Sequence, residues 1–398
     1  MTTLDRVLVA KQTALSRVQV AVFVPTVALT LIGLLMVYSA SFAIGLYDYG
    51  NVNYFITRQV MFAVPGAALL LIFMRIDYQR LRWLSPLILL IALAALLAVL
   101  VPGIGVASNG AQRWIRLGPL PPVQPSEFAK LALIIYVAHW LASKGERVKS
   151  FWLGVVPFVL TVALVGGLVL LQPDLGTGLV VVFVCGAMLW VGGARIQHAL
   201  ILATATLLSV ALYVAVEGYR VDRIYSFLHA EHDPGGRGYQ IVQLLIALGS
   251  GGIRGLGLGA SRQKFLYVPG AQTDGIFAII GEELGLIGAV AVLLLFAVLI
   301  GGGLMVAVRC KHDSFGALLA VGITSWIAFQ ALVNIAGVTR SLPLTGIPLP
   351  FMSYGGSALC AELAGIGVLL SICRNAPTAP PIPPPPVRPR PRPQRARR

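Results

Sequence analysis

The amino-acid sequence predicts an all-α integral membrane protein with about ten transmembrane helices and a large extracytoplasmic loop between spans 7 and 8. Of the 398 residues, 57% are hydrophobic and only 11% are charged. The mean hydropathy is +0.85. Apolar runs long enough to cross a bilayer as helices recur along the chain. A water-soluble domain of this size does not need so much apolar surface, so that class is excluded.

Ten apolar runs define the predicted spans. Their bounds are 19–44, 58–75, 84–103, 127–143, 151–171, 175–193, 197–216, 276–307, 315–337 and 350–373. Several are joined by short connections rich in Lys and Arg, at 76–83, 144–150, 194–196 and 308–314. The positive-inside rule places these connections and both chain termini in the cytoplasm. Three segments are then expected on the outer side, at 104–126, 217–275 and 338–349.

The chain divides into three parts. Residues 1–18 form a cytoplasmic segment, residues 19–374 the polytopic membrane domain, and residues 375–398 a cytoplasmic tail. The first apolar run is too long for the core of a signal peptide, so we interpret it as a retained span. The tail holds ten of the 25 prolines, and six arginines stand in its last eleven positions. This composition cannot bury a core and predicts a disordered extension with polyproline-II bias.

Charge and cysteine content limit the classes of function. Lys and Arg outnumber Asp and Glu by 30 to 15, which gives a net charge of +15. Such a charge is typical of nucleic-acid-binding proteins. In a membrane protein, cytoplasmic cations that face anionic lipid explain it better, so no nucleic-acid partner is expected. The four cysteines lack metal-type spacing, and we expect neither a disulfide framework nor a thiolate metal site.

The long polar interval from Arg220 to Gly275 contains the first candidate site. It ends in Asp274, where the eighth apolar run begins. A carboxylate at a membrane border, under a loop rich in cations, is a functional-site candidate. Arg262 and Lys264 precede it by ten to twelve residues and suit phosphate binding, although a solvated basic run is the alternative. A P-loop is excluded because no Gly-Lys-Ser/Thr follows the glycines of this interval.

The segment 109–130 is the second candidate. Arg113 stands beside Trp114, an arrangement suited to a phosphate headgroup next to a sugar or lipid face, but Trp is also a common membrane-interface anchor. Glu127 opens the next span, where a carboxylate favours the positive end of the helix dipole. Lys130 follows one turn later, so these two charges either pair with each other or contribute to the site.

Two further breaks between spans carry polar residues. Gln172 and Asp174 stand between the fifth and sixth spans, where Asp174 either caps the following helix or points a carboxylate at a cavity. Prolines interrupt the segment 342–358, and Ser353 lies in it before the last span. Irregular main chain at membrane depth occurs only when it is buried in protein or lines a cavity, so either a packing kink or a site is expected there.

The eighth run, 276–307, is longer than the roughly 20 residues that cross a bilayer. It is therefore expected to be tilted, to be broken, or to start above the membrane. Glu282 and Glu283 lie within it, and Glu362 lies within the tenth span. Adjacent helix positions diverge by about 100°, so Glu282 and Glu283 are expected not to face one site equally. At least one is expected to pair with an arginine or to line an aqueous cavity.

Together these segments resemble the SEDS family (shape, elongation, division and sporulation), the FtsW/RodA proteins of bacteria. The motifs that carry the resemblance are NGAQRWI, QPSEFAKLALI, LLQPDLGTG, GYQIVQ, IALGSGG, SRQKFLYVP, TDGIFAIIGEELG and LPFMSYGGS. They cover about residues 20–374, and the direct SRQKFLYVP join is closer to FtsW than to RodA. The chain departs from the usual His-Thr-Asp-Phe of the family, with Gln272 and Gly275 at the outer positions.

The resemblance implies a peptidoglycan glycosyltransferase of the inner (cytoplasmic) membrane that serves cell division or elongation. Its implied substrates are lipid II and the growing glycan strand. Its implied partners are a class B penicillin-binding protein, which crosslinks the strands, other divisome or elongasome proteins, and membrane lipid. The aspartate of the family motif maps to Asp274 and its tryptophan to Trp114, and GYQIVQ adds Gln240 to the candidate binding residues.

The candidate residues suit this chemistry. An acceptor hydroxyl must lose a proton as it attacks the anomeric carbon of a pyrophosphate-linked donor, and the Asp274 carboxylate can act as the general base. Arg and Lys side chains, with a divalent cation such as Mg²⁺ or Mn²⁺, can stabilise the leaving pyrophosphate. No organic cofactor is required. Because the leaving group is already activated, no second acidic residue is needed, and attack from the opposite face gives an inverted, β-1,4 linkage.

Two other functions are compatible with the sequence. The first is a flippase for lipid-linked cell-wall precursors, which the many spans and the glutamates within them would suit. No repeat relates the two halves of the chain, and this counts against a transporter. The second is a non-catalytic divisome scaffold that recruits other proteins through the Pro/Arg tail.

Truncation of the chain after Arg374 tests the interpretation of the tail. Because the tail has no composition from which to build a folded site, the truncated protein is expected to polymerise labelled lipid II in vitro as well as the full chain does. Loss of this activity in the truncated protein would contradict a purely solvated tail.

Overall fold

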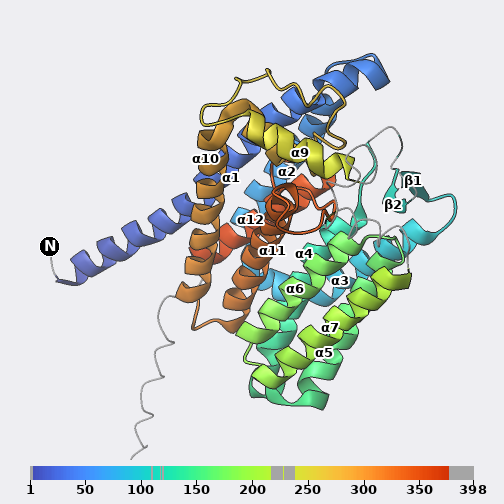
Figure 1. Ribbon diagram of the computed structural model, residues 1–398. Coiled ribbons are helices and arrows are strands. Elements are labelled where there is room, and N and C mark those ends of the chain that lie inside the picture. Colours follow the sequence, from blue (N-terminus) through green and yellow to red (C-terminus); the bar gives the residue numbers. More distant parts are fainter. Residues whose placement is uncertain are drawn as a thin grey trace, which may run out of the picture.

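The structure is a computed structural model that describes residues 3–108, 111–116, 118, 121–216, 227 and 238–375. Long helices make up almost all of it, with one short β-hairpin (Figure 1). The tail beyond Asn375 and, apart from Phe227, residues 217–237 of the large loop lie outside the described residues. The disorder predicted for the tail therefore stays a prediction.

Ten helices correspond to the ten predicted spans. They are α1 (Thr3–Tyr49), α2 (Tyr54–Arg75), α3 (Tyr78–Leu100), α4 (Pro125–Lys144), α5 (Val156–Leu170), α6 (Leu175–Val191), α7 (Ile196–Val216), α10 (Ile276–Arg309), α11 (Ser314–Val338) and α12 (Gly356–Asn375). Within the described part of the chain, seven helices are long and apolar enough to cross a membrane. Three of the ten helices are not among these seven. Helix α4 carries the charged residues Glu127 and Lys130, and the apolar stretches of α6 and α7 are shorter. The predicted fold class, an all-α polytopic membrane protein, is confirmed.

The remaining elements are short. Strands β1 (Gly105–Ser108) and β2 (Ala111–Ile115) form an antiparallel hairpin after α3. A 3₁₀ turn, η1 (Gly145–Lys149), and a π turn, η2 (Phe151–Val155), lead into α5. Helix α9 (Tyr239–Ser250) lies within the large loop, where the sequence analysis did not predict a helix, and packs against α10.

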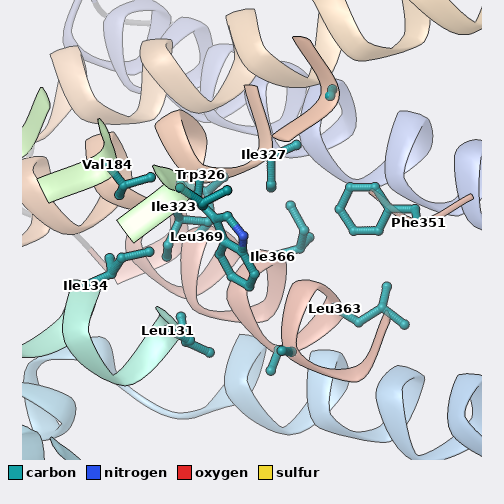
Figure 2. Packing of buried hydrophobic residues seen from close by; sticks show 14 of the residues in the cluster. Leu131, Ile134, Val184, Ile323, Trp326, Ile327, Phe351, Leu363, Ile366 and Leu369 are labelled. Atoms are coloured by element: carbon teal, nitrogen blue, oxygen red, sulfur yellow. The ribbon is translucent and has the colours of Figure 1, made fainter. Parts of the chain in front are cut away.

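Helices α11 and α12 form the interior of the bundle. Buried residues make up 94% of the apolar stretch of α12 and 72% of that of α11, against 39% or less in the other five long spans. Helix α12 packs against α1, α2, α4 and α11. Figure 2 shows the indole of Trp326 from α11 surrounded by aliphatic side chains of several helices, among them Leu131, Ile134, Val184, Ile323 and Leu369.

Glycines allow the close approach of α12 to its neighbours. A Cβ atom added to Gly367 would lie 2.5 Å from the carbonyl oxygen of Leu70 in α2. A Cβ atom at Gly365 would lie 3.3 Å from the Trp326 ring. Small residues at such contacts let membrane helices pack backbone against backbone, so α12 is fixed between α2 and α11.

Two helices differ in extent from the predicted spans. Helix α1 begins at Thr3 and continues to Tyr49, so residues 3–18 extend the first span as helix instead of preceding it. Helix α12 begins only at Gly356, six residues after the predicted start of the last span. The irregular residues before it include Phe351, whose φ of 62° is incompatible with a continuous right-handed helix.

Helix α10 is broken at Gly285, which has φ 67° and ψ −167°. Residues 251–257 lie against the break and replace the helical hydrogen bonds lost there. The replacing bonds run from Leu256 N to Glu282 O (3.0 Å), Gly257 N to Glu283 O (3.0 Å), Leu286 N to Gly252 O (2.9 Å) and Ile287 N to Ile253 O (3.2 Å). The sequence allowed a break in this long run, and the exchange of partners shows how its main chain stays hydrogen-bonded at membrane depth.

The side chains of Glu282 and Glu283 both bind one loop, at residues 259–264, which corrects the expectation that they face different surroundings. Glu282 accepts hydrogen bonds from Ser261 Oγ, Arg262 N and Gln263 N. Glu283 accepts from Ser39 Oγ, Gly259 N, Ser261 N and Lys264 Nζ. The loop winds round the helix just before its break, so it reaches both carboxylates. Among the residues that the structure describes, no arginine side chain is paired with either carboxylate.

Removal of one partner of the buried Lys264–Glu283 ion pair should destabilise the protein strongly. Its atoms lie 3.1 Å apart, with side chains 4% and 0% exposed. Changing Lys264 to Met leaves the buried carboxylate without its counter-charge and should cost about 3–5 kcal/mol, seen as a lower melting temperature in detergent. The control is Lys149→Met, which removes the exposed Lys149–Glu146 pair and should change little. Equal melting temperatures of the two variants would contradict the role of the buried pair.

Candidate functional site

Asp274 lies in a tight turn immediately before α10. The turn is closed by hydrogen bonds from Thr273 N (2.9 Å) and Gly275 N (3.0 Å) to the carbonyl oxygen of Gly270. The Thr273 hydroxyl also lies 3.1 Å from Oδ1 of the Asp274 carboxylate. Gly270 has φ 69°, and a Cβ there would lie 2.5 Å from the same Oδ1. A glycine at position 270 therefore lets the turn fold back against the half-buried carboxylate.

The main chain around Asp274 is held by side chains from elsewhere in the protein. Asn334 on α11 donates from Nδ2 to the Asp274 carbonyl oxygen (2.9 Å). Ser353 donates from Oγ to the Thr273 carbonyl oxygen (2.6 Å), and Tyr354 N donates to the Gln272 carbonyl oxygen (2.8 Å). Three consecutive carbonyl groups, of residues 272–274, are thus fixed from outside the turn.

A second polar cluster joins the hairpin to the start of α6. Arg113 donates from Nε to the Gln172 carbonyl oxygen (3.0 Å) and from its terminal nitrogen to that of Pro173. Its guanidinium also lies 4.0 Å from the Asp174 carboxylate. Asp174 caps α6, because it accepts hydrogen bonds from Thr177 N (3.0 Å) and Thr177 Oγ1 (2.9 Å). The capping role considered for Asp174 is therefore observed.

The third cluster is a buried chain of polar side chains across α4, α11 and α12. Lys130 lies 2.8 Å from Glu127 in an ion pair, as the sequence allowed, and donates to Gln330 Oε1 (3.2 Å). Gln330 donates in turn to Glu362 Oε1 (3.1 Å). These four residues are at most 4% exposed. Glu362 has two amide partners, the Gln330 side chain and Phe351 N (2.8 Å).

The irregular segment 342–355 connects the three clusters. A Cβ at Gly176, in the first turn of α6, would lie 2.9 Å from the Ile347 side chain. Just after the segment, Ser357 accepts a hydrogen bond from Gln124 N (2.9 Å), and the Gln124 side chain reaches Asp174 Oδ2 (3.3 Å). Helices α4, α6, α10 and α12 therefore all begin at this site.

The structure places the other predicted site residues as follows. Trp114 is half-buried in β2 opposite Val106. Gln240 on α9 donates to the Pro269 carbonyl oxygen (3.2 Å), close in sequence to the Asp274 turn. Arg262 is exposed, whereas Lys264 is buried and paired with Glu283. The two basic side chains therefore do not form the single donor set expected from the sequence. Their roles in binding substrate stay predictions.

Sequence reasoning missed the residues that fix the site. Gln59 on α2 donates to the Ser353 carbonyl oxygen (3.1 Å) and accepts from Gly355 N (3.2 Å). Asn334 and Gln330 on α11 were also missed. These residues could have been found as amide side chains within otherwise apolar spans. Burying an amide in such a span costs free energy unless it has hydrogen-bond partners, so its presence indicates a polar contact.

The described residues contain no group of three or more His, Cys, Asp or Glu side chains that could hold a metal ion. They therefore provide no protein-only cage for the Mg²⁺ or Mn²⁺ considered from the sequence. Mg²⁺ commonly binds through one or two carboxylates together with substrate phosphates. The divalent cation considered from the sequence stays a prediction.

The fold and the site define a multi-pass helical membrane protein with a carboxylate held where several of its helices begin. The family model FtsW/RodA/SpoVE, described as "Cell cycle protein", matches residues 19–377. The chain belongs to this family.

Individual relatives agree with the family match. Stage V sporulation protein E of Bacillus subtilis is 45% identical over 349 residues, 88% of this chain and 95% of that protein. The probable peptidoglycan glycosyltransferase FtsW of Trichlorobacter lovleyi is 42% identical over 355 residues, 89% and 92% of the two chains. A solved structure on the coordination of polymerization and crosslinking by a peptidoglycan synthase complex contains a chain with a TM-score of 0.68 and 31% identity, covering 86% and 97%. The SEDS resemblance, with its FtsW character, is confirmed.

Gly275, where the family usually has an aromatic residue, occupies a crowded position. A Cβ there would lie 3.2 Å from Gly270 O, from Leu244 Cδ2 and from Val268 Cγ1. Leu244 and Val268 therefore occupy space next to this residue that a larger side chain would need.

Restoring the aromatic residue should therefore destabilise this protein. Gly275→Phe would displace neighbouring side chains, and overpacking of this kind costs typically about 1–3 kcal/mol. The expected result is a lower melting temperature in detergent. The matched control is Gly186→Phe on α6, an exposed position where a Cβ meets nothing within 4 Å. A melting temperature of Gly275→Phe equal to that of the control would show that the turn accommodates the ring.

Proposed function

We propose that this protein polymerises lipid II into β-1,4-linked glycan strands at the outer face of the cytoplasmic membrane, with Asp274 as the general base. Support comes from the family and from its FtsW relatives, which are named as probable peptidoglycan glycosyltransferases. The observation that carries the proposal is the fixation of the Asp274 turn by three separate contacts, from Asn334, Ser353 and Tyr354.

The reaction requires one proton acceptor and one departing anion. The acceptor hydroxyl attacks the anomeric carbon of the donor sugar, and the new C–O bond forms as the bond to the pyrophosphate oxygen breaks. The hydroxyl proton passes to the Asp274 carboxylate, and the polyprenyl pyrophosphate leaves with the bonding electrons. A general base contributes typically about 10²–10⁴-fold to such a rate, provided that it is held in position.

The departing pyrophosphate needs positive charge, and we assign this role to two helix N-termini and two arginines. Helices α10 and α12 begin at the site without an acidic residue in their first turns, and helix N-termini stabilise anions. The Arg262 side chain is exposed, and that of Arg113 keeps 28% of its surface exposed while it binds the Gln172–Asp174 turn. We assign both arginines to the pyrophosphate or its approach.

The proposed partner is a class B penicillin-binding protein. The likeness to a chain of a peptidoglycan synthase complex described as coordinating polymerization and crosslinking supports this assignment. The proposed orientation, with both termini in the cytoplasm, rests on the basic connections between the spans. It places the Asp274 turn on the side of the membrane where the glycan is assembled.

Replacement of Asp274 tests the function. The protein is purified with its penicillin-binding partner and supplied with labelled lipid II, and glycan chains are separated by gel electrophoresis. Asp274→Asn keeps the shape but cannot take up the proton, so polymerisation should fall by about 10²-fold or more. The matched control is Asp48→Asn, an exposed carboxylate on α1, which should leave the rate unchanged.

Two outcomes would oppose this proposal. Polymerisation by Asp274→Asn at the wild-type rate would remove Asp274 from the chemistry. No polymerisation by the wild-type complex, together with translocation of lipid II across vesicles that contain the protein, would favour a flippase.

A further inference from the structure

Two amide side chains on one face of α11 bind the irregular segment before α12. This segment in turn contacts the Asp274 turn. Gln330 and Asn334 are four residues apart, so they lie one above the other on the helix. Gln330 donates from Nε2 to the Pro348 carbonyl oxygen (3.2 Å), and Asn334 donates from Nδ2 to that of Ile347 (2.8 Å). The two side chains therefore bind successive carbonyl groups of the irregular main chain before α12.

Asn334 also reaches the Asp274 turn directly. Its Nδ2 group donates to both Ile347 O (2.8 Å) and Asp274 O (2.9 Å), which uses both of its hydrogens. The side chain is 4% exposed, so water cannot easily replace it. One amide group thus sets the distance between the Asp274 main chain and the segment that leads into α12.

The rest of that segment is held so that it supports the same turn. Glu362 on α12 accepts a hydrogen bond from Phe351 N (2.8 Å), at a residue whose φ of 62° is unfavourable for a non-glycine side chain. Two residues later, Ser353 Oγ accepts from Leu349 N (2.8 Å) and donates to Thr273 O (2.6 Å). The strained bend therefore aims the Ser353 hydroxyl at the residue before Asp274.

We propose that Asn334 is a positioning residue for Asp274, and that Ser353, considered from the sequence as a substrate contact, acts with it in the same role. Neither side chain needs to touch substrate. Each fixes a main-chain carbonyl of the Thr273–Asp274 pair, so that the carboxylate meets the acceptor hydroxyl in one orientation. This inference rests on the proposed glycosyltransferase function of Asp274.

The role predicts a particular pattern of kinetic effects. Loss of a positioning contact lowers the rate of the chemical step without weakening the binding of substrate. Asn334→Ala should therefore lower kcat for lipid II polymerisation about 10- to 100-fold, since displacement of a catalytic group by about 1 Å can cost this much, and should leave KM for lipid II unchanged.

A second variant separates hydrogen bonding from size. Asn334→Leu keeps about the same size but has no hydrogen-bond donor. If the donor matters, kcat of Asn334→Leu should fall about as far as that of Asn334→Ala. If Asn334 merely fills space, the Leu variant should be the more active of the two, which would overturn the proposal.

The control lies on the same helix. Thr324 is buried on α11, and its hydroxyl has no hydrogen-bond partner among the described residues. Thr324→Ala removes a buried side chain that makes no hydrogen bond to the Asp274 turn, so it should match the wild type in kcat and in KM. If Asn334→Ala fails to fold, Ser353→Ala serves in its place, because it removes only one hydroxyl and should lower kcat about 10-fold with KM unchanged.

The outcomes distinguish this inference from the function on which it rests. An inactive wild-type complex would reject the glycosyltransferase proposal itself. An active wild type, with folded Asn334→Ala and Ser353→Ala variants that retain full kcat, would overturn the positioning role alone. A variant that raises KM at constant kcat would also overturn it, because that result indicates a direct substrate contact. When both changes are combined, we expect a loss in kcat smaller than the product of the single losses, since both act on one turn.

Discussion

The structure depends on the hydrogen bonding of irregular main chain at membrane depth. Hydrocarbon offers no partners for exposed N–H and C=O groups, so each interruption of a helix must be satisfied within the protein. At the Gly285 break, main chain of residues 251–257 replaces the lost helical bonds. Before α12, the amides Gln330 and Asn334 perform the equivalent task with their side chains. The second interruption contacts the Asp274 turn through Ser353, Tyr354 and Asn334, so the hydrogen bonds that satisfy it also fix the proposed base.

Two pairs of buried charged side chains neutralise each other inside the protein. The Lys264–Glu283 and Lys130–Glu127 pairs are both buried, and further hydrogen bonds reach Glu283 and Lys130 from other helices. The Arg262 side chain is exposed, and α10 and α12 begin at the site without an acidic residue in their first turns. This separation suits a reaction whose leaving group is anionic, because the cations available to it are not already paired with the glutamates of the interior.

Hydropathy predicted all ten helices because the requirement for apolar length is local in sequence. The position of Asp274 at the start of α10 followed from the same pattern. The contacts of Asn334 could not be predicted, because its partners Asp274 and Ile347 are set by tertiary packing. The expectation that Glu282 and Glu283 do not face one site equally considered only the angle between adjacent helix positions, whereas residues of one loop, 259–264, donate hydrogen bonds to both carboxylates. Helix α9 was missed within an interval interpreted as polar loop.

The most direct test of this account is an experimental structure of the protein with an unreactive donor analogue and an acceptor saccharide bound. The account predicts the Asp274 carboxylate within about 2.6–3.2 Å of the acceptor hydroxyl, with the Asn334 contact to the Asp274 carbonyl retained. Saccharides bound at a site remote from Asp274, or an Asp274 turn released from Asn334 in that complex, would contradict it.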